Sequence, residues 1–229
     1  MTDHWHLEHE DFFEDLPQLK EEFIRRATRL DLKKNDFVFF EDEPGDRCYL
    51  LEQGVVKILR STMQGKEPIF FIRRAGELFG LAEVIDGKTR KCNAQCLTPC
   101  AMYVVAKDDF EFLLAHHHAF ARKVIALLGK RLRFLSEQLE NVMLHDVTSR
   151  LLKILLYLGF SKLSECHWPN SPVTIPRSLT QEEIAAMTGS CQQTVSEILK
   201  QFERDGLIHI SRKEIKFLKP GDMLERLYH

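Results

Sequence analysis

The sequence lacks several features that would place it in other functional classes. Its longest apolar run, from about Leu151 to Phe160, is interrupted by Lys153 and is too short to span a bilayer. The N-terminus is acidic and does not have the basic-then-apolar order of a signal peptide. No Ser/His/Asp set or pair of carboxylates has the spacing of a recognisable catalytic site. We therefore expect a cytoplasmic protein that is neither an enzyme nor membrane-embedded.

The cysteines lack the spacing of a metal centre. The chain contains no CxxC pair, whereas an iron–sulfur cluster takes four thiolates that usually include closely spaced pairs. Cys92 and Cys96 would lie about 13 Å apart within one strand, which is too far for a disulfide or a shared metal. We expect reduced, mostly structural thiols and no iron–sulfur cluster. The cysteines are Cys48, Cys92, Cys96, Cys100, Cys166 and Cys191.

The chain also has no excess of positive charge. Its formal net charge is −2, and the part from His145 onward holds 11 basic and 10 acidic residues. Binding to a nucleic acid would therefore depend on where individual Lys and Arg residues lie, because the overall charge supplies no attraction.

The chain has 229 residues, which is long enough for two domains, each with its own hydrophobic core. Residues from about Glu10 to Thr28 are predicted to be helical. From Leu30 to about Lys107, short apolar runs alternate with glycine turns, and this pattern predicts a small β-barrel or β-roll. The runs are DFVFFED, CYLLEQGVVKILRS, EPIFFIRR and CNAQCLTPCAMYVVA.

From Ala119 the period becomes helical for about seven turns. Apolar residues spaced alternately four and three apart predict a heptad seam, which is typical of a helix that pairs with a second copy. A neighbouring stripe, which includes Phe120 and Phe134, could pack on the chain's own roll. The alternative is one wide stripe on an intramolecular helix. The predicted dimer interface is Ile125, Leu128, Leu132, Leu135, Leu139 and Val142.

The helix is expected to break near His145–Asp146, and a further helix is expected from Val147 to Gly159. Residues from Ser164 to Arg177 contain three prolines and predict a loop-rich stretch that includes a β-hairpin.

The stretch from Leu179 to Ile208 predicts two short helices joined by a tight turn. Thr180 and Glu183 have the spacing of a capping box. Gly189 suits the left-handed conformation of a helix-turn-helix corner, and Ser190 is expected to cap the second helix. The alternative interpretation is a plain helical hairpin with no DNA-binding role.

Polar residues on the outer side of the second helix favour DNA binding, because a major groove is read by such side chains. The following run, LIHISRKEIKFLKP, predicts the hairpin of a winged helix with basic residues at its tip. The predicted DNA-binding residues are Gln192, Gln193, Thr194, Ser196, Glu197, Lys200, Arg212 and Lys213.

Taken in order, a β-roll, a long helix and a winged helix resemble the cyclic-AMP receptor protein/FNR family of bacterial transcription regulators. The local matches are PGDRCYLLEQGVVKI, AGELFG, HDVTSRL and LTQEEIAAMTGSCQQTVSEILKQFERDGLI. The resemblance implies an α+β fold with a sensor domain in residues 1–118, a dimerisation helix in 119–144 and a winged helix-turn-helix in 145–229. It also implies a homodimer that binds palindromic double-stranded DNA, responds to a small effector and has RNA polymerase as a further partner.

The resemblance also identifies the sensor positions. In cyclic-AMP-binding members, a Glu after FG contacts the ribose, and an Arg followed by Ser or Thr binds the cyclic phosphate. Here Leu81 replaces the Glu, Arg90 matches the Arg, and Lys91 replaces the hydroxyl residue. Because Leu81 cannot accept a hydrogen bond, each unpaired ligand group would cost roughly 1–3 kcal/mol. We expect an effector other than cyclic AMP, in a pocket comprising Leu81, Arg90, Lys91, Leu132, Leu135 and Ser136.

Two alternatives stay open at the sensor. Arg90 and Lys91 could form a solvated turn that binds nothing. Haem is also an open cofactor, although the histidine that carbon-monoxide-sensing relatives place after the FG turn is replaced here by Ala82. Several histidines could bind haem or a metal, and the alternative is that they are solvated surface residues. They are His4, His6, His9 and His116–His118.

No metal ligand is assigned, and the effector is unknown. The second candidate function is a non-DNA-binding, effector-sensing scaffold, and it rests only on the near-neutral charge of the C-terminal part.

Overall fold

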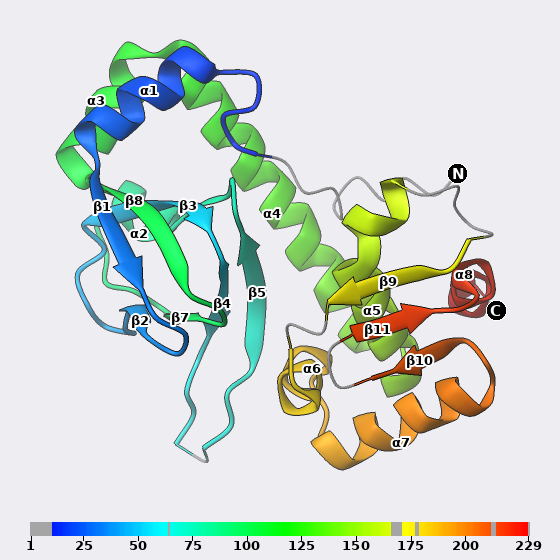
Figure 1. Cartoon of the computed structure of the whole chain (residues 1–229). Helices are drawn as coiled ribbons and strands as arrows, with labels where there is room; N and C mark the ends of the chain where they lie inside the picture. The colour runs from blue at the N-terminus through cyan, green and yellow to red at the C-terminus, as the bar shows by residue number, and fades with distance from the viewer. Residues whose placement is uncertain (1–10, 64, 166–170, 177–178, 212–213, 229) are drawn as a thin grey trace. The chain divides into compact units, whose positions relative to one another are not determined.

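The computed structural model describes residues 11–63, 65–165, 171–176, 179–211 and 214–228. The chain divides into an N-terminal unit that ends at Arg131 and a C-terminal unit that begins at Leu132. Helix α4 (His118–Leu144) runs from the first unit into the second (Figure 1). Among the described residues, no helix is both long and apolar enough to cross a bilayer.

Two antiparallel four-stranded sheets form the β-roll of the N-terminal unit. One has the strand order β1-β8-β3-β6 and the other the order β2-β7-β4-β5. The predicted runs correspond to β2, β3 with β4, β5, and β7 with β8, whereas the sequence pattern does not predict β1 or the two-residue strand β6. The strands are β1 (Thr28–Leu32), β2 (Phe37–Phe39), β3 (Arg47–Gln53), β4 (Val55–Leu59), β5 (Ile69–Arg74), β6 (Leu78–Phe79), β7 (Asn93–Cys96) and β8 (Cys100–Ala106).

Three helices besides α4 belong to this unit: α1 (Pro17–Arg26), α2 (Leu81–Asp86) and α3 (Lys107–His116). The predicted N-terminal helix is too long, because α1 begins at Pro17, which lacks an N–H and is tolerated in the first turn. Phe12 and Phe13 lie in the preceding turn and are nevertheless buried. Neither α2 nor α3 is predicted from the sequence.

A cluster of phenylalanine rings forms the core between the helices and the first sheet. Phe120 of α4 lies at its centre, with ring centroids 5.6 Å from Phe12 and 5.7 Å from Phe110. Val124 is buried in the same cluster. The first part of this stripe, Phe120 and Val124, therefore packs on the chain's own roll, as the sequence suggests for one of the two stripes on this helix. A second core between the sheets includes Tyr49, Phe79 and Met102.

Among the described residues, the C-terminal unit combines the end of α4 and four further helices with a three-stranded antiparallel sheet of order β10-β11-β9. Hydrophobic side chains of the helices and of β11 are buried in its core, among them Leu155, Leu199, Phe202 and Phe217. The elements are α5 (Val147–Glu165), β9 (Val173–Pro176), α6 (Gln181–Thr188), α7 (Gln192–Arg204), β10 (Ile208–Ile210), β11 (Glu214–Phe217) and α8 (Pro220–Tyr228).

One prediction for this unit is wrong, and another falls partly outside the described residues. Helix α5 continues past Gly159 to Glu165, because Gly159 faces the Phe217 ring, where any larger residue would collide with it. The hairpin expected between Ser164 and Arg177 is not formed within residues 171–176. The single strand there, β9, pairs with β11 and extends the wing sheet. Residues 166–170 and 177–178 lie outside the described residues.

Candidate DNA-recognition surface and sensor site

The corner between α6 and α7 has the geometry of a helix-turn-helix. The Thr180 hydroxyl accepts a hydrogen bond from the Glu183 N–H at 3.1 Å, and the Glu183 carboxylate accepts one from the Thr180 N–H at 2.9 Å. This capping box fixes the start of α6. Gly189 has a φ of +67°, the left-handed conformation expected at the corner.

The cap of the second helix differs from the prediction. Cys191, and not Ser190, occupies the N-cap position of α7. The Ser190 N–H donates to the Ala185 carbonyl at 3.1 Å, so this residue still belongs to the exit from α6. The side chain of Cys191 is exposed, and its Sγ lies 3.1 Å from the Thr194 hydroxyl. That hydrogen bond lowers the pKa of the Cys191 thiol below its ordinary value.

Helix α7 has one buried and one exposed face. Val195, Leu199 and Phe202 are buried in the core, which fixes the rotation of the helix about its axis. The predicted DNA-binding residues lie on the other face or beside it. Gln192, Gln193, Glu197 and Lys200 are exposed, whereas Thr194 and Ser196 are partly buried; Arg212 and Lys213 lie outside the described residues.

Two of the exposed residues of α7 interact with each other. The Gln193 side-chain amide donates to the Glu197 carboxylate at 3.3 Å, one helical turn away. The carboxylate and the amide therefore form one polar group on the exposed face, which presents both hydrogen-bond donors and acceptors to a ligand.

The C-terminal end of α7 is held by a contact that the sequence does not predict. Asp205 accepts hydrogen bonds from Gln201 at 2.6 Å and from Arg226 of α8 at 2.8 Å. The hydrogen bond from Arg226 lowers the pKa of the Asp205 carboxyl. Met223 of α8 is also buried, so α8 both packs on this unit and holds the end of α7.

A second set of contacts fixes the start of α5 beside the same corner. The Ser149 N–H donates to the Asp146 carboxylate at 2.8 Å, and this bond lowers the pKa of Asp146. Arg150 donates to the carbonyls of His145 and Thr188, each at 3.0 Å. The expected break at His145–Asp146 is thus a capped helix start, and Arg150 connects it to the end of α6.

Most of the predicted dimer seam is exposed on α4. Ile125, Leu132, Leu139 and Val142 have exposed fractions between 62% and 69%, and Leu135 is 46% exposed. Leu128 differs, because it is partly buried against the core of the N-terminal unit. Phe134 of the second stripe lies near Tyr157 of α5, with ring centroids 5.8 Å apart.

The predicted sensor residues of the roll lie in three different environments. Arg90 has an exposed fraction of 1%, so a solvated turn is the wrong interpretation for this residue. Leu81 is buried in the phenylalanine core, and Lys91 is exposed. Of the sensor residues predicted on α4, Ser136 is exposed and donates to the Leu132 carbonyl at 3.1 Å. The grouping of these residues around one effector stays a prediction.

Arg90 takes part in a dense set of contacts within the roll. Its guanidinium donates to the Glu83 carboxylate and to the Gly80 carbonyl, each at 3.0 Å, and also to the Arg47 carbonyl. The guanidinium carbon lies 4.3 Å from the centre of the Phe39 ring. Glu83 is a partner that the sequence pattern does not indicate, because it lies two residues beyond the position of the family's ribose-binding Glu.

Comparison with known proteins assigns both units. Residues 29–117 match the family of cyclic nucleotide-binding domains, and residues 149–226 match the Crp-like helix-turn-helix domain. The chain belongs to the CRP/FNR family of transcription regulators. The predicted family and fold class are therefore confirmed.

The relatives of this CRP/FNR-family chain are transcription regulators and not enzymes. The CRP-like cAMP-activated global transcriptional regulator of Mycobacterium tuberculosis is 28% identical over 191 residues, which cover 83% of this chain and 84% of that protein. The global nitrogen regulator of Synechococcus elongatus is also 28% identical, over 90% of this chain and 88% of its own length. The solved structure of the c-di-GMP responsive global regulator CLP of Xanthomonas campestris shares the fold, with a TM-score of 0.74 and 21% identity over 88% of this chain and 98% of that one.

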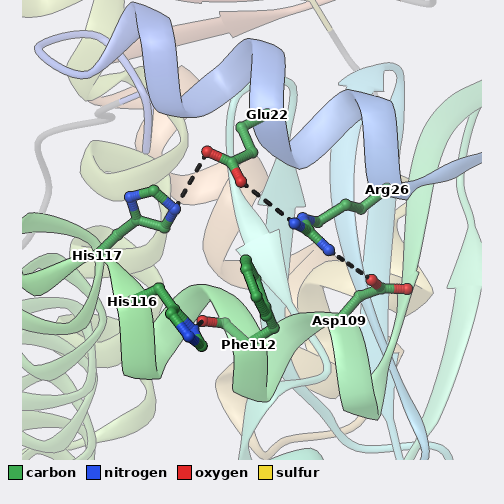
Figure 2. Close-up of polar contacts among 6 residues, drawn as sticks. All are labelled: Glu22, Arg26, Asp109, Phe112, His116 and His117. Atoms are coloured by element: carbon green, nitrogen blue, oxygen red, sulfur yellow. Dashed lines mark hydrogen bonds and ion pairs between the residues drawn. The ribbon is translucent and has the colours of Figure 1, made fainter.

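The histidines of the CRP/FNR-family chain do not converge on a metal or haem within the described residues. His117, between α3 and α4, points to the Glu22 carboxylate on α1, with an Nε2–Oε2 distance of 3.1 Å (Figure 2). His116 points the other way and places Nδ1 2.9 Å from the Phe112 carbonyl. His118 is exposed, and His4, His6 and His9 lie outside the described residues.

The described cysteines likewise form no metal site, and Cys166 lies outside the described residues. Across the part of the chain that the structure describes, no group of three or more His, Cys, Asp or Glu residues has the arrangement of a metal site. Cys48, Cys96 and Cys100 are buried, and burial raises the pKa of the Cys96 thiol to about 12. The residues described here therefore do not fit an iron–sulfur cluster, which needs thiolates.

Proposed function

We propose that the protein is a homodimeric, sequence-specific DNA-binding transcription activator, switched by an effector other than cyclic AMP. The observation that carries the proposal is the exposed polar face of α7. Gln192, Gln193 and Glu197 are exposed on a helix whose opposite face is fixed in the core and whose two ends are held by the corner and by α8. Such a helix can enter a major groove without losing contacts of its own fold.

Dimerisation is supported by the apolar face of α4. Five large apolar residues of the heptad pattern are exposed on one helix, and covering them with a second copy would remove this surface from water. A two-fold dimer would present two copies of α7, and its DNA site would then be a palindrome with half-sites about one helical turn apart.

The chemistry of α7 suggests which bases are read. Gln192 and Gln193 suit the N6 and N7 edge of adenine, and Glu197 can accept from the amino group of cytosine. Lys200 is placed to contact phosphate, as we also expect of Arg212 and Lys213. Because an Arg is absent from the position of Glu197, we expect half-sites that differ from TGTGA and TTGAT.

The proposal that the effector differs from cyclic AMP is supported by two residues of the N-terminal unit. Leu81 is in the core, and Arg90 is already paired with a carboxylate. Because bacterial DNA lies in the cytoplasm, we expect the protein there. Activation of transcription would also require contact with RNA polymerase. A visible absorption spectrum of the purified protein would test for haem or an iron–sulfur cluster in one measurement.

Selection from random double-stranded DNA with the full-length protein tests the proposed function. We expect a palindrome to be enriched, with positions that respond when Glu197 is changed to Ala. Gln181→Ala on α6 is a control that removes an amide away from the proposed reading face. No binding to any DNA at low salt would favour the scaffold function. Enrichment of TGTGA half-sites that do not respond to the Glu197 substitution would contradict the assignment of the reading residues.

A further inference from the structure

Arg90 is the largest fully buried side chain among the described residues. A guanidinium keeps its positive charge at any physiological pH, so its burial is costly unless the fold supplies a counter-charge and hydrogen-bond acceptors. The identity of that counter-charge decides whether Arg90 is available to an anionic ligand.

The fold supplies the counter-charge from within. Glu83 of α2 pairs with Arg90 at 3.0 Å, whereas the carbonyls of Gly80 and Arg47, which also accept from its guanidinium, are neutral. The Phe39 ring adds a cation–π contact. Glu83 is therefore the carboxylate that neutralises Arg90 in this set of contacts.

The backbone around Arg90 is fixed as well. Its N–H donates to the Glu43 carbonyl at 2.8 Å, and its carbonyl accepts from the Asp42 N–H at 2.9 Å. This pairing fixes the position of the Arg90 backbone, and the side chain is 1% exposed, so an anion would have to come to the guanidinium. The Glu83 side chain is 18% exposed, against 1% for Arg90, so the carboxylate is the group that solvent reaches. An incoming anion would meet a like charge.

We infer that Glu83 is a tethered counterion that takes the place of an anionic ligand at Arg90. It makes the N-terminal unit reject small oxyanions and cyclic phosphodiesters at this position. The inference deepens the proposed function by excluding one class of effector, and it rests on that function only in treating the N-terminal unit as the sensor.

The test is chemical rescue of the full-length variant Glu83→Ala. Removing the carboxylate leaves a buried positive charge with neutral partners and a space that a small oxyanion can fill. We compare thermal unfolding in sodium chloride, acetate and phosphate at equal ionic strength and pH. For Glu83→Ala, acetate and phosphate should raise Tm by about 3 °C or more over chloride, by the mass-action effect of a ligand that binds only the folded state.

Two matched variants accompany it. Asp86→Ala removes an exposed acidic residue from the same helix, one that pairs with Lys88 and not with Arg90, and it should show no oxyanion-specific rise. Glu83→Gln removes the charge but still fills the space, so its oxyanion response should be smaller than that of Glu83→Ala. The unaltered protein gives the general stabilising effect of acetate and phosphate over chloride, and the expected rise for Glu83→Ala is counted beyond that effect.

Calorimetry on the unaltered protein gives an independent measurement, which decides the matter if Glu83→Ala does not fold. We expect no saturable heat from cyclic AMP, cyclic GMP or inorganic phosphate. Saturable binding of any of these, an oxyanion response of Asp86→Ala equal to that of Glu83→Ala, or a folded Glu83→Ala protein with no such response would overturn the inference. None of these readouts uses DNA, so this inference and the proposed DNA binding can fail separately.

Discussion

Glu197 is an exposed acidic residue on the α7 face that is proposed to contact DNA, where a basic residue would be attracted to phosphate. Its carboxylate is exposed and accepts a hydrogen bond from Gln193. A carboxylate is repelled by phosphates but can accept from a cytosine amino group. Replacing Glu197 with Ala should therefore reduce preference at one base pair of each half-site by about 1–3 kcal/mol, while affinity for unrelated DNA stays equal or rises.

Competition binding against a set of single-base variants of the selected site would measure this preference. Glu182→Ala is the matched control, because Glu182 is an exposed acidic residue of α6 and its loss changes the net charge equally. Equal loss of affinity across all base variants with Glu197→Ala would show that Glu197 has a structural role and does not read a base.

Glu22 provides a pH-dependent contribution to stability in the N-terminal unit. Its carboxylate lies between His117 and Arg26, and Arg26 also pairs with Asp109 at 3.1 Å (Figure 2). Desolvation opposes ionisation, but the charges and hydrogen bonds of His117 and Arg26 together lower the pKa of Glu22 below its ordinary value. A carboxyl whose pKa is lower in the folded than in the unfolded protein stabilises the fold above the unfolded pKa, and this stabilisation disappears as the pH falls through the folded pKa.

We therefore expect Glu22→Gln to unfold at lower urea concentration than the unaltered protein at pH 7. The difference between the two midpoints should shrink as the pH is lowered below about 4. Glu21→Gln, which removes a neighbouring exposed acidic residue, should show little difference at any pH. A difference for Glu22→Gln that stays constant into acid would mean that packing, and not charge, accounts for its effect.

At the scale of single elements, the helix that follows α4 depends on one cap. Asp146 accepts the Ser149 N–H and has a lowered pKa because of that hydrogen bond. Asp146→Ala should destabilise the first turn of α5 by about 1 kcal/mol, whereas Asn retains an acceptor and should lose only a few tenths. Hydrogen exchange of the amides near Ser149 measures this local opening. Equal exchange in the Ala and Asn variants would exclude a capping role.

The elements show where sequence patterns succeed and where they do not. The heptad stripe, the capping box at Thr180 and the glycine corner at Gly189 depend on residues close together in the chain, and these patterns predict α4 and α6 well. The pairing of β9 with β11 and the continuation of α5 through Gly159 depend on contacts distant in sequence. Local propensity contains no information about such contacts.

The same limit applies to the candidate sites. Residue type and helical spacing predict which face of α7 is exposed, because the buried residues recur every three or four positions. The pairing of Arg90 with Glu83 was not predictable in this way, since a short helix and a loop bring the two together in the fold. The resemblance to cyclic-AMP sensors predicts Arg90 as a ligand-binding residue, and only the structure shows its internal partner.

At the scale of the whole molecule, the near-zero net charge would make the proposed DNA binding depend on a dimer. The net charge is −2, so long-range attraction to DNA is small, and in the proposed dimer the affinity would come from the contacts of both copies of α7. Two linked half-sites raise affinity because the second contact is intramolecular once the first has formed. Loss of the dimer should then remove most specific binding, even though each α7 is unchanged.

The last prediction tests this dependence through α4. Leu132 and Leu139 are exposed by 66% and 62%, and a lysine at either position would place a charge in the proposed seam without disturbing a core. We expect Leu132→Lys and Leu139→Lys to sediment as monomers with unchanged circular dichroism, and to lose at least about tenfold in affinity for the palindrome but little for a single half-site. Ala119→Lys, at an exposed position of α4 outside the seam, should remain dimeric and bind normally. If both leucine variants stay dimeric at low concentration, the seam is not the dimer interface, and the apolar face of α4 must have another partner.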